Sequence, residues 1–173
     1  LLKAPGSDGV SGLEKILQTI GPKGLYILLG TGDRDTEVFL TQTAATHPNF
    51  LFLNSYAAGL SDVLYASGDL FLMPSSFEPC GIGQMLAMRD SQPCLVNLTG
   101  GLRDTVQPGI NGFGFDGATL HEQVDHMAAA LTDALKLCAE SSNDWQKVCE
   151  AAAAARFLWA DSAKQYIEKL YQR

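Results

Sequence analysis

Short apolar runs alternate with helix-type patterns along the first two thirds of this chain, and this alternation constrains its fold most strongly. Each run is continuously apolar, as expected for a strand of a parallel sheet that helices cover on both faces. We therefore predict an α/β fold with a doubly wound, Rossmann-like parallel sheet. Strands are expected at residues 25–29, 50–53, 69–73, 93–97 and 113–115, and helices at 11–20, 35–47, 61–66 and 81–90.

From about residue 120 the pattern changes to successive helices with no strand between them. An alanine run at 151–155 strongly favours helix. The stretch 161–171 places its apolar side chains on one helical face, and Asp161 is expected to be its N-cap. We predict a single Rossmann-like domain over residues 1–173, with a helical C-terminal extension from about residue 120.

Composition argues against several classes of function. The chain has 19 acidic and 12 basic residues, a net charge of −7 and no block of Lys or Arg, which is unlike a nucleic-acid-binding surface. No apolar stretch approaches the roughly 20 residues of a membrane span. The cysteines and histidines lack zinc-site spacing, so we expect no metal and reduced thiols, with Cys94 and Cys138 in the core. The first residues match neither a signal peptide nor an initiator methionine, and we expect a piece of a larger protein.

Ligands of doubly wound sheets bind outside the carboxyl ends of the strands, so the loops after the strands are the candidate site. The longest such loop carries Glu78, which Pro79 favours in an extended conformation. Gly81 and Gly83 then allow close backbone approach, and free N–H groups at the start of the next helix suit an anion. A carboxylate near an anion site fits a nucleotide sugar. A plain strand-to-helix loop with a capping glutamate fits the same residues equally well.

Two more glycine-rich loops follow other predicted strands. Thr99, Gly100 and Gly101 could bring backbone amides to the same ligand, although a turn that merely needs glycine explains them as well. The loop at 30–33 falls short of the Gly-x-Gly-x-x-Gly fingerprint, which argues against a nicotinamide-type domain.

Three motifs strongly resemble bacterial glycogen synthases and plant starch synthases. They are Pro-Ser-Ser-Phe-Glu-Pro-Cys-Gly at 74–81, Gln-Met-Leu-Ala-Met at 84–88 and Thr-Gly-Gly-Leu-Arg-Asp-Thr-Val at 99–106. Residues 29–33 and 159–166 fit the same pattern, so the resemblance covers nearly the whole chain in order. These enzymes are retaining glucosyltransferases of the two-domain GT-B fold. The resemblance implies that this chain is their C-terminal domain, which binds the nucleotide sugar.

The resemblance also implies roles for residues that match the family's motifs. Glu78 corresponds to the glutamate placed against the hydroxyls of the donor glucose and is the expected catalytic residue. Cys80 and Gly81 correspond to residues that line the sugar. Ile82 and Gly83 correspond to the helix start whose amides receive the distal phosphate.

Further implied contacts come from two other loops. Tyr56 lies at the position of the aromatic ring that packs on the base, and Thr99, Gly100 and Gly101 match a loop beside the sugar. The family needs no metal or other cofactor, because the helix start and two basic residues meet the phosphate charge. Those basic residues belong to an Arg-Leu-Thr-x-Gln-Lys element that this chain does not contain, and Lys3 is a poor substitute.

Smaller departures lie inside the matched motifs. Ser76 stands where the family usually has arginine, and Gly83 where it has a larger polar residue. Leu86 stands where related transferases place a second glutamate, as in the synthase branch.

By resemblance, the intact enzyme moves glucose from ADP-glucose to the end of an α-1,4-glucan with retention of configuration. The glucan acceptor would bind through an N-terminal domain, so the fragment alone is expected to be inactive. Two alternatives stay open: a retaining transferase for another nucleotide sugar, and a non-catalytic module that binds nucleotides or glucans. We expect a bacterial cytoplasmic protein with no membrane or nucleic-acid partner, and a plastid location is not excluded.

Overall fold

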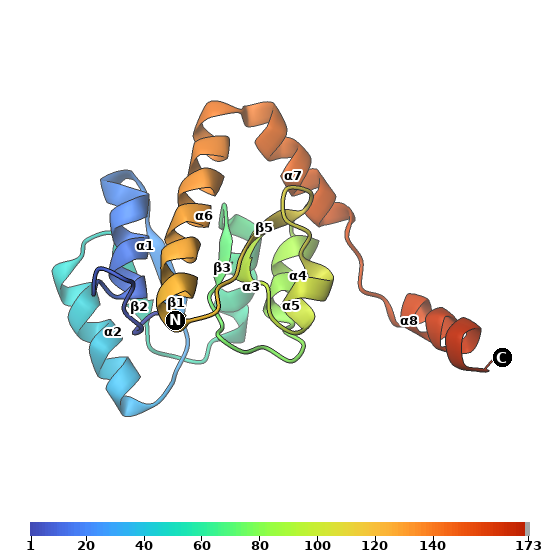
Figure 1. Cartoon of the computed structure of the whole chain (residues 1–173), viewed down its shortest axis with the longest axis horizontal. Coiled ribbons are helices and arrows are strands. Elements are labelled where there is room, and N and C mark those ends of the chain that lie inside the picture. Colours follow the sequence, from blue (N-terminus) through green and yellow to red (C-terminus); the bar gives the residue numbers. More distant parts are fainter. Residues whose placement is uncertain (172–173) are drawn as a thin grey trace.

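The structure is a computed structural model, in which residues 1–171 are described (Figure 1). The first half contains α1 (Gly12–Ile20), a 3₁₀ turn (Gly21–Lys23), β1 (Tyr26–Leu29), α2 (Arg34–Thr46), β2 (Phe50–Leu53), α3 (Ala58–Ser67) and β3 (Phe71–Met73). The second half contains α4 (Gly83–Arg89), β4 (Cys94–Asn97), α5 (Gly101–Thr105), β5 (Gly112–Phe115), α6 (Leu120–Glu140), α7 (Ser142–Ala154), α8 (Trp159–Tyr166) and a π-helical turn (Ile167–Tyr171).

The α/β fold class is confirmed, and each predicted strand is found within two residues of its expected bounds. All the strand pairs are parallel, but the strands form two sheets rather than one. One sheet has the order β1-β2 and the other β3-β4-β5. Pairing is in register from Tyr26 opposite Phe50 in the first sheet, and from Phe71 opposite Cys94 in the second.

Strand β4 is the most buried strand, because side chains cover it on both faces. Cys94 and Val96 point into a cluster with residues of α4, α5 and α7. Leu95, between them, points to the opposite face, where it packs with side chains of α1 and α6. This alternation is what a strand with period two requires when helices lie on both sides. Burial raises the pKa of the Cys94 thiol to about 12, so it stays protonated in the core.

The N-terminal segment is tied to both α1 and α6. Ser11 and Glu14 form a capping box at the start of α1. Lys15 of that helix forms ion pairs with Asp8, at 2.7 Å, and with Asp125 of α6, at 3.1 Å. Hydrogen bonds from Ser7 and the charge of Lys15 lower the pKa of Asp125 to about 2.

Residues 1–3 lie at the edge of the molecule where the carboxyl ends of strands from both sheets are found. The Leu1 backbone nitrogen donates to the carbonyl oxygen of Pro74, just after β3, at 3.3 Å. The pKa of Asp33, just after β1, is lowered by hydrogen bonds from Thr36 and also by the charge of Lys3. The carboxyl ends of β1 and β3 therefore lie on the same side of the molecule.

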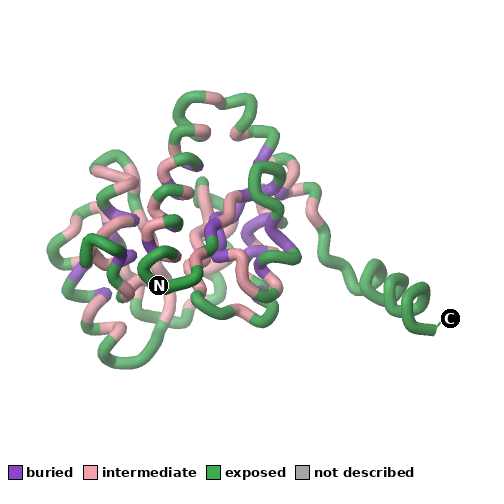
Figure 2. The backbone as a smooth tube through the Cα atoms, viewed as in Figure 1, coloured by how far each residue is buried: buried purple, intermediate pink, exposed green. Residues whose placement is uncertain are grey.

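The C-terminal helices differ in how they pack. Helices α6 and α7 contribute to the core, whereas α8 projects away from the other elements and is exposed along its length (Figures 1 and 2). Leu158, not Asp161, is the N-cap of α8, so the predicted cap is wrong. Cys138 is exposed on α6 and is not a core residue. Within residues 1–171, no helix is long and apolar enough to cross a membrane.

Candidate functional site at the carboxyl ends of β3 and β4

The loop between β3 and α4, residues 74–82, is shaped by a left-handed glycine. Gly81 has φ +76°, a conformation that side-chain-bearing residues rarely adopt. This turn delays the start of α4 to Gly83, two residues after its predicted start, and Ile82 becomes an N-cap without a side-chain hydrogen bond. The first amides of α4 are therefore left without a capping side chain.

The two glycines of the turn at 99–101 pack directly on this loop. A Cβ atom at Gly100 would overlap the carbonyl oxygen of Glu78, and one at Gly101 would overlap Cys80. The Gly101 amide donates to the carbonyl oxygens of Glu78, at 3.3 Å, and Pro79, at 3.2 Å. The glycines thus permit close contact between the two loops. The Gly101 amide donates its hydrogen bond within the protein rather than to a ligand.

The structure brings most of the predicted site residues together. Glu78, Cys80 and Gly81 share the loop after β3, and Gly100 and Gly101 meet that loop from the end of β4. Within the loop, Glu78 is half-buried and Cys80 is exposed. The Cys80 thiol reaches the Gly81 carbonyl oxygen at 3.6 Å.

Tyr56 is not brought to this cluster. It follows β2, in the other sheet, and is 90% exposed, so its ring packs against neither loop. The glycine-containing loop after β1 has a structural explanation. Asp33 caps α2 by accepting from the Thr36 amide, and Glu37 accepts from the Gly32 amide at 3.0 Å.

Buried side-chain amides hold the site together, and the sequence analysis did not single them out. Asn97, at the end of β4, donates to the Ser75 carbonyl oxygen at 2.9 Å. Gln84, in α4, donates to the loop carbonyls and to Thr105 of α5. One signal was available for Gln84: it opens an otherwise apolar run, Gln-Met-Leu-Ala-Met, on a helix that has to pack against a sheet.

Few cations lie near this edge of the molecule. Lys3 is exposed beside the loop after β1, and Arg34 is exposed at the end of that loop, where α2 begins. Arg103 of α5 already donates from its guanidinium to the Leu98 carbonyl oxygen, at 2.7 and 3.0 Å. In residues 1–171 no three His, Cys, Asp or Glu residues are grouped as metal ligands would be. Metal-independent chemistry stays a prediction.

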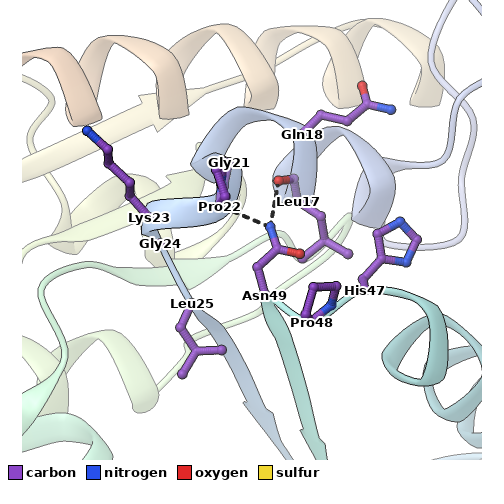
Figure 3. A pocket seen from close by; sticks show the side chains of 10 residues that line it. All are labelled: Leu17, Gln18, Gly21, Pro22, Lys23, Gly24, Leu25, His47, Pro48 and Asn49. Atoms are coloured by element: carbon purple, nitrogen blue, oxygen red, sulfur yellow. Dashed lines mark hydrogen bonds between the residues drawn. The ribbon is translucent and has the colours of Figure 1, made fainter.

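A separate hollow of about 550 Å³ lies at the other end of the first sheet (Figure 3). Its walls include Leu25 and Asn49, which precede β1 and β2. The Asn49 side-chain amide donates to the carbonyl oxygens of Leu17 and Gly21, at 3.0 Å each. These bonds give the Asn49 side chain a structural role. The hollow lies apart from the motif loops.

Comparison with known families identifies the class of protein to which this parallel α/β fold and its two motif loops belong. Residues 9–148 match the family described as glycosyl transferases group 1. The chain belongs to this family, as its motifs predicted.

Within that family, the chain is similar to glycogen synthases. It is 40% identical to the glycogen synthase of Streptococcus uberis over 170 residues, which are 94% of this chain and 34% of that protein. It is 37% identical to the glycogen synthase of Natranaerobius thermophilus over 155 residues, which are 86% of this chain and 30% of that protein. The chain therefore spans about a third of the length of these relatives.

Solved structures give the same picture. The catalytic domain of starch synthase IV from Arabidopsis thaliana, bound to ADP and acarbose, matches with a TM-score of 0.72 and 30% identity, over 91% of this chain and 34% of that one. Anabaena HepE in complex with UDP-glucose matches with a TM-score of 0.69 and 23% identity, over 94% of this chain and 45% of that one, a likeness of fold.

Proposed function

We propose that this chain is the donor-binding domain of a glucosyltransferase that moves glucose from ADP-glucose to the end of an α-1,4-glucan. One observation carries the proposal: the Glu78 loop and the turn at 99–101, the two most specific motifs, are in direct backbone contact at the carboxyl edge of β3 and β4. This is the edge at which doubly wound sheets bind their ligands. The similarity to glycogen synthases and to an ADP-bound starch synthase supports this choice of donor and acceptor.

The proposed chemistry divides the loop into two parts. The Glu78 carboxylate orients the donor glucose and stabilises the positive charge that develops on it as the bond to the diphosphate breaks. The amides of Ile82 and Gly83 receive the departing diphosphate, while Cys80 and Gly81 line the sugar. Tyr56 would pack on the base. No cofactor or metal takes part, and the acceptor glucan is held by a part of the enzyme outside these residues.

Donor specificity tests this proposal directly. The full-length protein should transfer glucose from ADP-glucose to glycogen, with lower turnover of UDP- and GDP-sugars. Activity with a non-glucose donor alone would favour the alternative, a retaining transferase of another nucleotide sugar. We propose a cytoplasmic location, and fractionation of the native cell would test it.

Replacing Glu78 tests the role of its carboxylate. We expect Glu78→Gln to reduce kcat by at least about a hundredfold, the scale on which single electrostatic contacts act in transition states, while ADP binding changes little because the diphosphate contacts remain. Radiolabelled glucose transfer and calorimetry with ADP measure the two quantities. Unchanged transfer by this variant would overturn the role given to the Glu78 carboxylate, and no transfer by the wild type would favour a non-catalytic nucleotide- or glucan-binding module instead.

A further inference from the structure

Gln84 is the most connected polar side chain beneath the Glu78 loop. It is fully buried in the first turn of α4. Its Nε2 group lies 3.0 Å from the Gly81 carbonyl oxygen, 3.2 Å from that of Cys80 and 3.2 Å from the Thr105 hydroxyl. All three neighbours are acceptors for its two hydrogens, which fixes the orientation of the carboxamide. Its Oε1 atom is buried without a hydrogen-bond partner and lies beside Gly81.

These contacts determine which way two peptide units face. In a trans peptide the C=O and N–H groups point in opposite directions, and no peptide bond within residues 1–171 is cis. Because Gln84 holds the carbonyls of Cys80 and Gly81 inward, the amides of Gly81 and Ile82 point away from it. Within residues 1–171, neither amide donates to a protein acceptor. Both donors thus point away from Gln84. Because Gly81 is buried and Ile82 is exposed, the Ile82 amide is the one placed to meet a ligand.

The same carboxamide links the loop to the neighbouring turn. The Thr105 hydroxyl, which accepts from Gln84, donates in turn to the Gly101 carbonyl oxygen at 2.9 Å. On the other side of Gly101, its amide donates to the carbonyls of Glu78 and Pro79. A closed set of hydrogen bonds therefore runs from α4 through α5 and the turn back to the Glu78 loop.

From this geometry we propose that Gln84 is a positioning residue for the donor diphosphate. It sets the Ile82 amide toward the ligand and keeps the two motif loops in register, without touching the ligand itself. The inference rests on the proposed function for the identity of the ligand, a nucleoside diphosphate. The orientation of the peptide units rests on the contacts alone.

The test replaces Gln84 by methionine, which keeps the shape of the side chain but removes both hydrogen-bond donors. Gln92→Met is the matched control, because Gln92 is 5% exposed, also has an unpartnered Oε1, and lies at the amino end of β4, far from the loop. In the full-length protein we expect the Kd for ADP, measured by calorimetry, to rise at least about tenfold for Gln84→Met and less than about twofold for Gln92→Met. Equal effects of the two variants would overturn the proposal.

A second variant, Gln84→Glu, supplies a readout that a merely structural role would not give. Its buried carboxyl faces three acceptors, so its pKa is expected to rise. When protonated, it can donate to the Gly81 carbonyl; when ionised, it repels it. Relative to the wild type at the same pH, the ADP affinity of this variant should therefore recover as the pH is lowered. An affinity that does not recover at low pH would count against the proposal.

Crystal structures of the variants separate this inference from the proposed function. In Gln84→Met the peptide between Gly81 and Ile82 should rotate and the φ of Gly81 should leave its present value. Rotation in a protein whose wild type binds no ADP would support the positioning role and reject the ligand. An unmoved peptide would reject the positioning role even if the enzyme synthesises glucan.

Discussion

At the scale of single residues, two glycines with positive φ angles differ in what surrounds them. Gly100 has φ +47° and lies against the Glu78 carbonyl, whereas Gly109 has φ +78° and open space where a side chain would go. An alanine at either position adopts an unfavourable conformation, at a cost of about 1–2 kcal/mol. Only at position 100 does the added methyl group also push a motif loop away from its partner.

Alanine substitutions at these two positions should therefore diverge. We expect Gly109→Ala to lower the free energy of unfolding by about 1 kcal/mol and to leave glucose transfer intact. Gly100→Ala should cost about 2 kcal/mol more, the scale of overpacking, and should abolish most of the transfer. Urea unfolding and glucan synthesis of the two variants, made in the full-length protein and compared side by side, measure the stability and the transfer. Equal activities would show that contact between the loops is not needed for function.

Residue patterns predicted part of this site and missed part of it. The Glu78 segment and the glycines at 99–101 could be predicted from the sequence, because residue types in that order are rare outside such motifs. The role of Gln84 is predicted only in part, because a single glutamine in an apolar helical run indicates that its side chain needs polar partners but not which ones. One of its hydrogen-bond partners, Thr105, is 21 residues away in the sequence. Thr105 belongs to another helix and meets Gln84 only because the chain folds. Likewise, sequence alone gave no sign that the Gly101 amide is already bonded.

At the scale of elements, α8 shows where periodicity stops being informative. Its stretch places apolar residues on one helical face, which usually predicts packing on a core. In the structure Trp159 is 88% exposed, and the substantial contacts of α8 are with the π-helical turn that follows it. The helix exists as predicted, but the apolar face has no partner within residues 1–171. Strand positions were predicted better because a covered parallel strand has no polar face at all.

Truncation tests the independence of α8 from the rest of the chain. Removing residues 157–173 should change the free energy of unfolding of the chain by less than about 0.5 kcal/mol, because exposed residues contribute little. Removing residues 142–173 is the contrasting deletion, since it also takes α7 and its core residue Ala152. That deletion should unfold the chain or leave it strongly destabilised in a urea titration. A large loss from the shorter deletion would mean that α8 packs on the domain in solution.

At the scale of the whole molecule, more surface is accessible than in a compact protein of the same mass. The accessible area is 10099 Å², against about 8,200 Å² expected for a compact protein of this mass. Within residues 1–171, strand β1 is paired only with β2, and β3 only with β4, so each has an edge without a partner there. All residues of β1 and β3 are only partly buried, in contrast to the fully buried β4. Sequence periodicity gives the strands but not their neighbours, and therefore predicted one continuous sheet.

The charge of the whole chain leads to a last prediction. With a net charge of −7, and with Lys3, Arg34 and an already bonded Arg103 as the cations near the carboxyl ends of the strands, residues 1–173 offer little electrostatic attraction for a diphosphate. We expect calorimetry to give an ADP Kd well above 1 µM for residues 1–173 and tighter binding for the full-length protein. Circular dichroism of the same sample checks that the chain is folded. A Kd of 1 µM or below would show that the loop amides suffice without further cations. Added salt screens both the repulsion and the attraction between ADP and this acidic chain. The affinity of residues 1–173 for ADP should therefore fall little between low and moderate ionic strength.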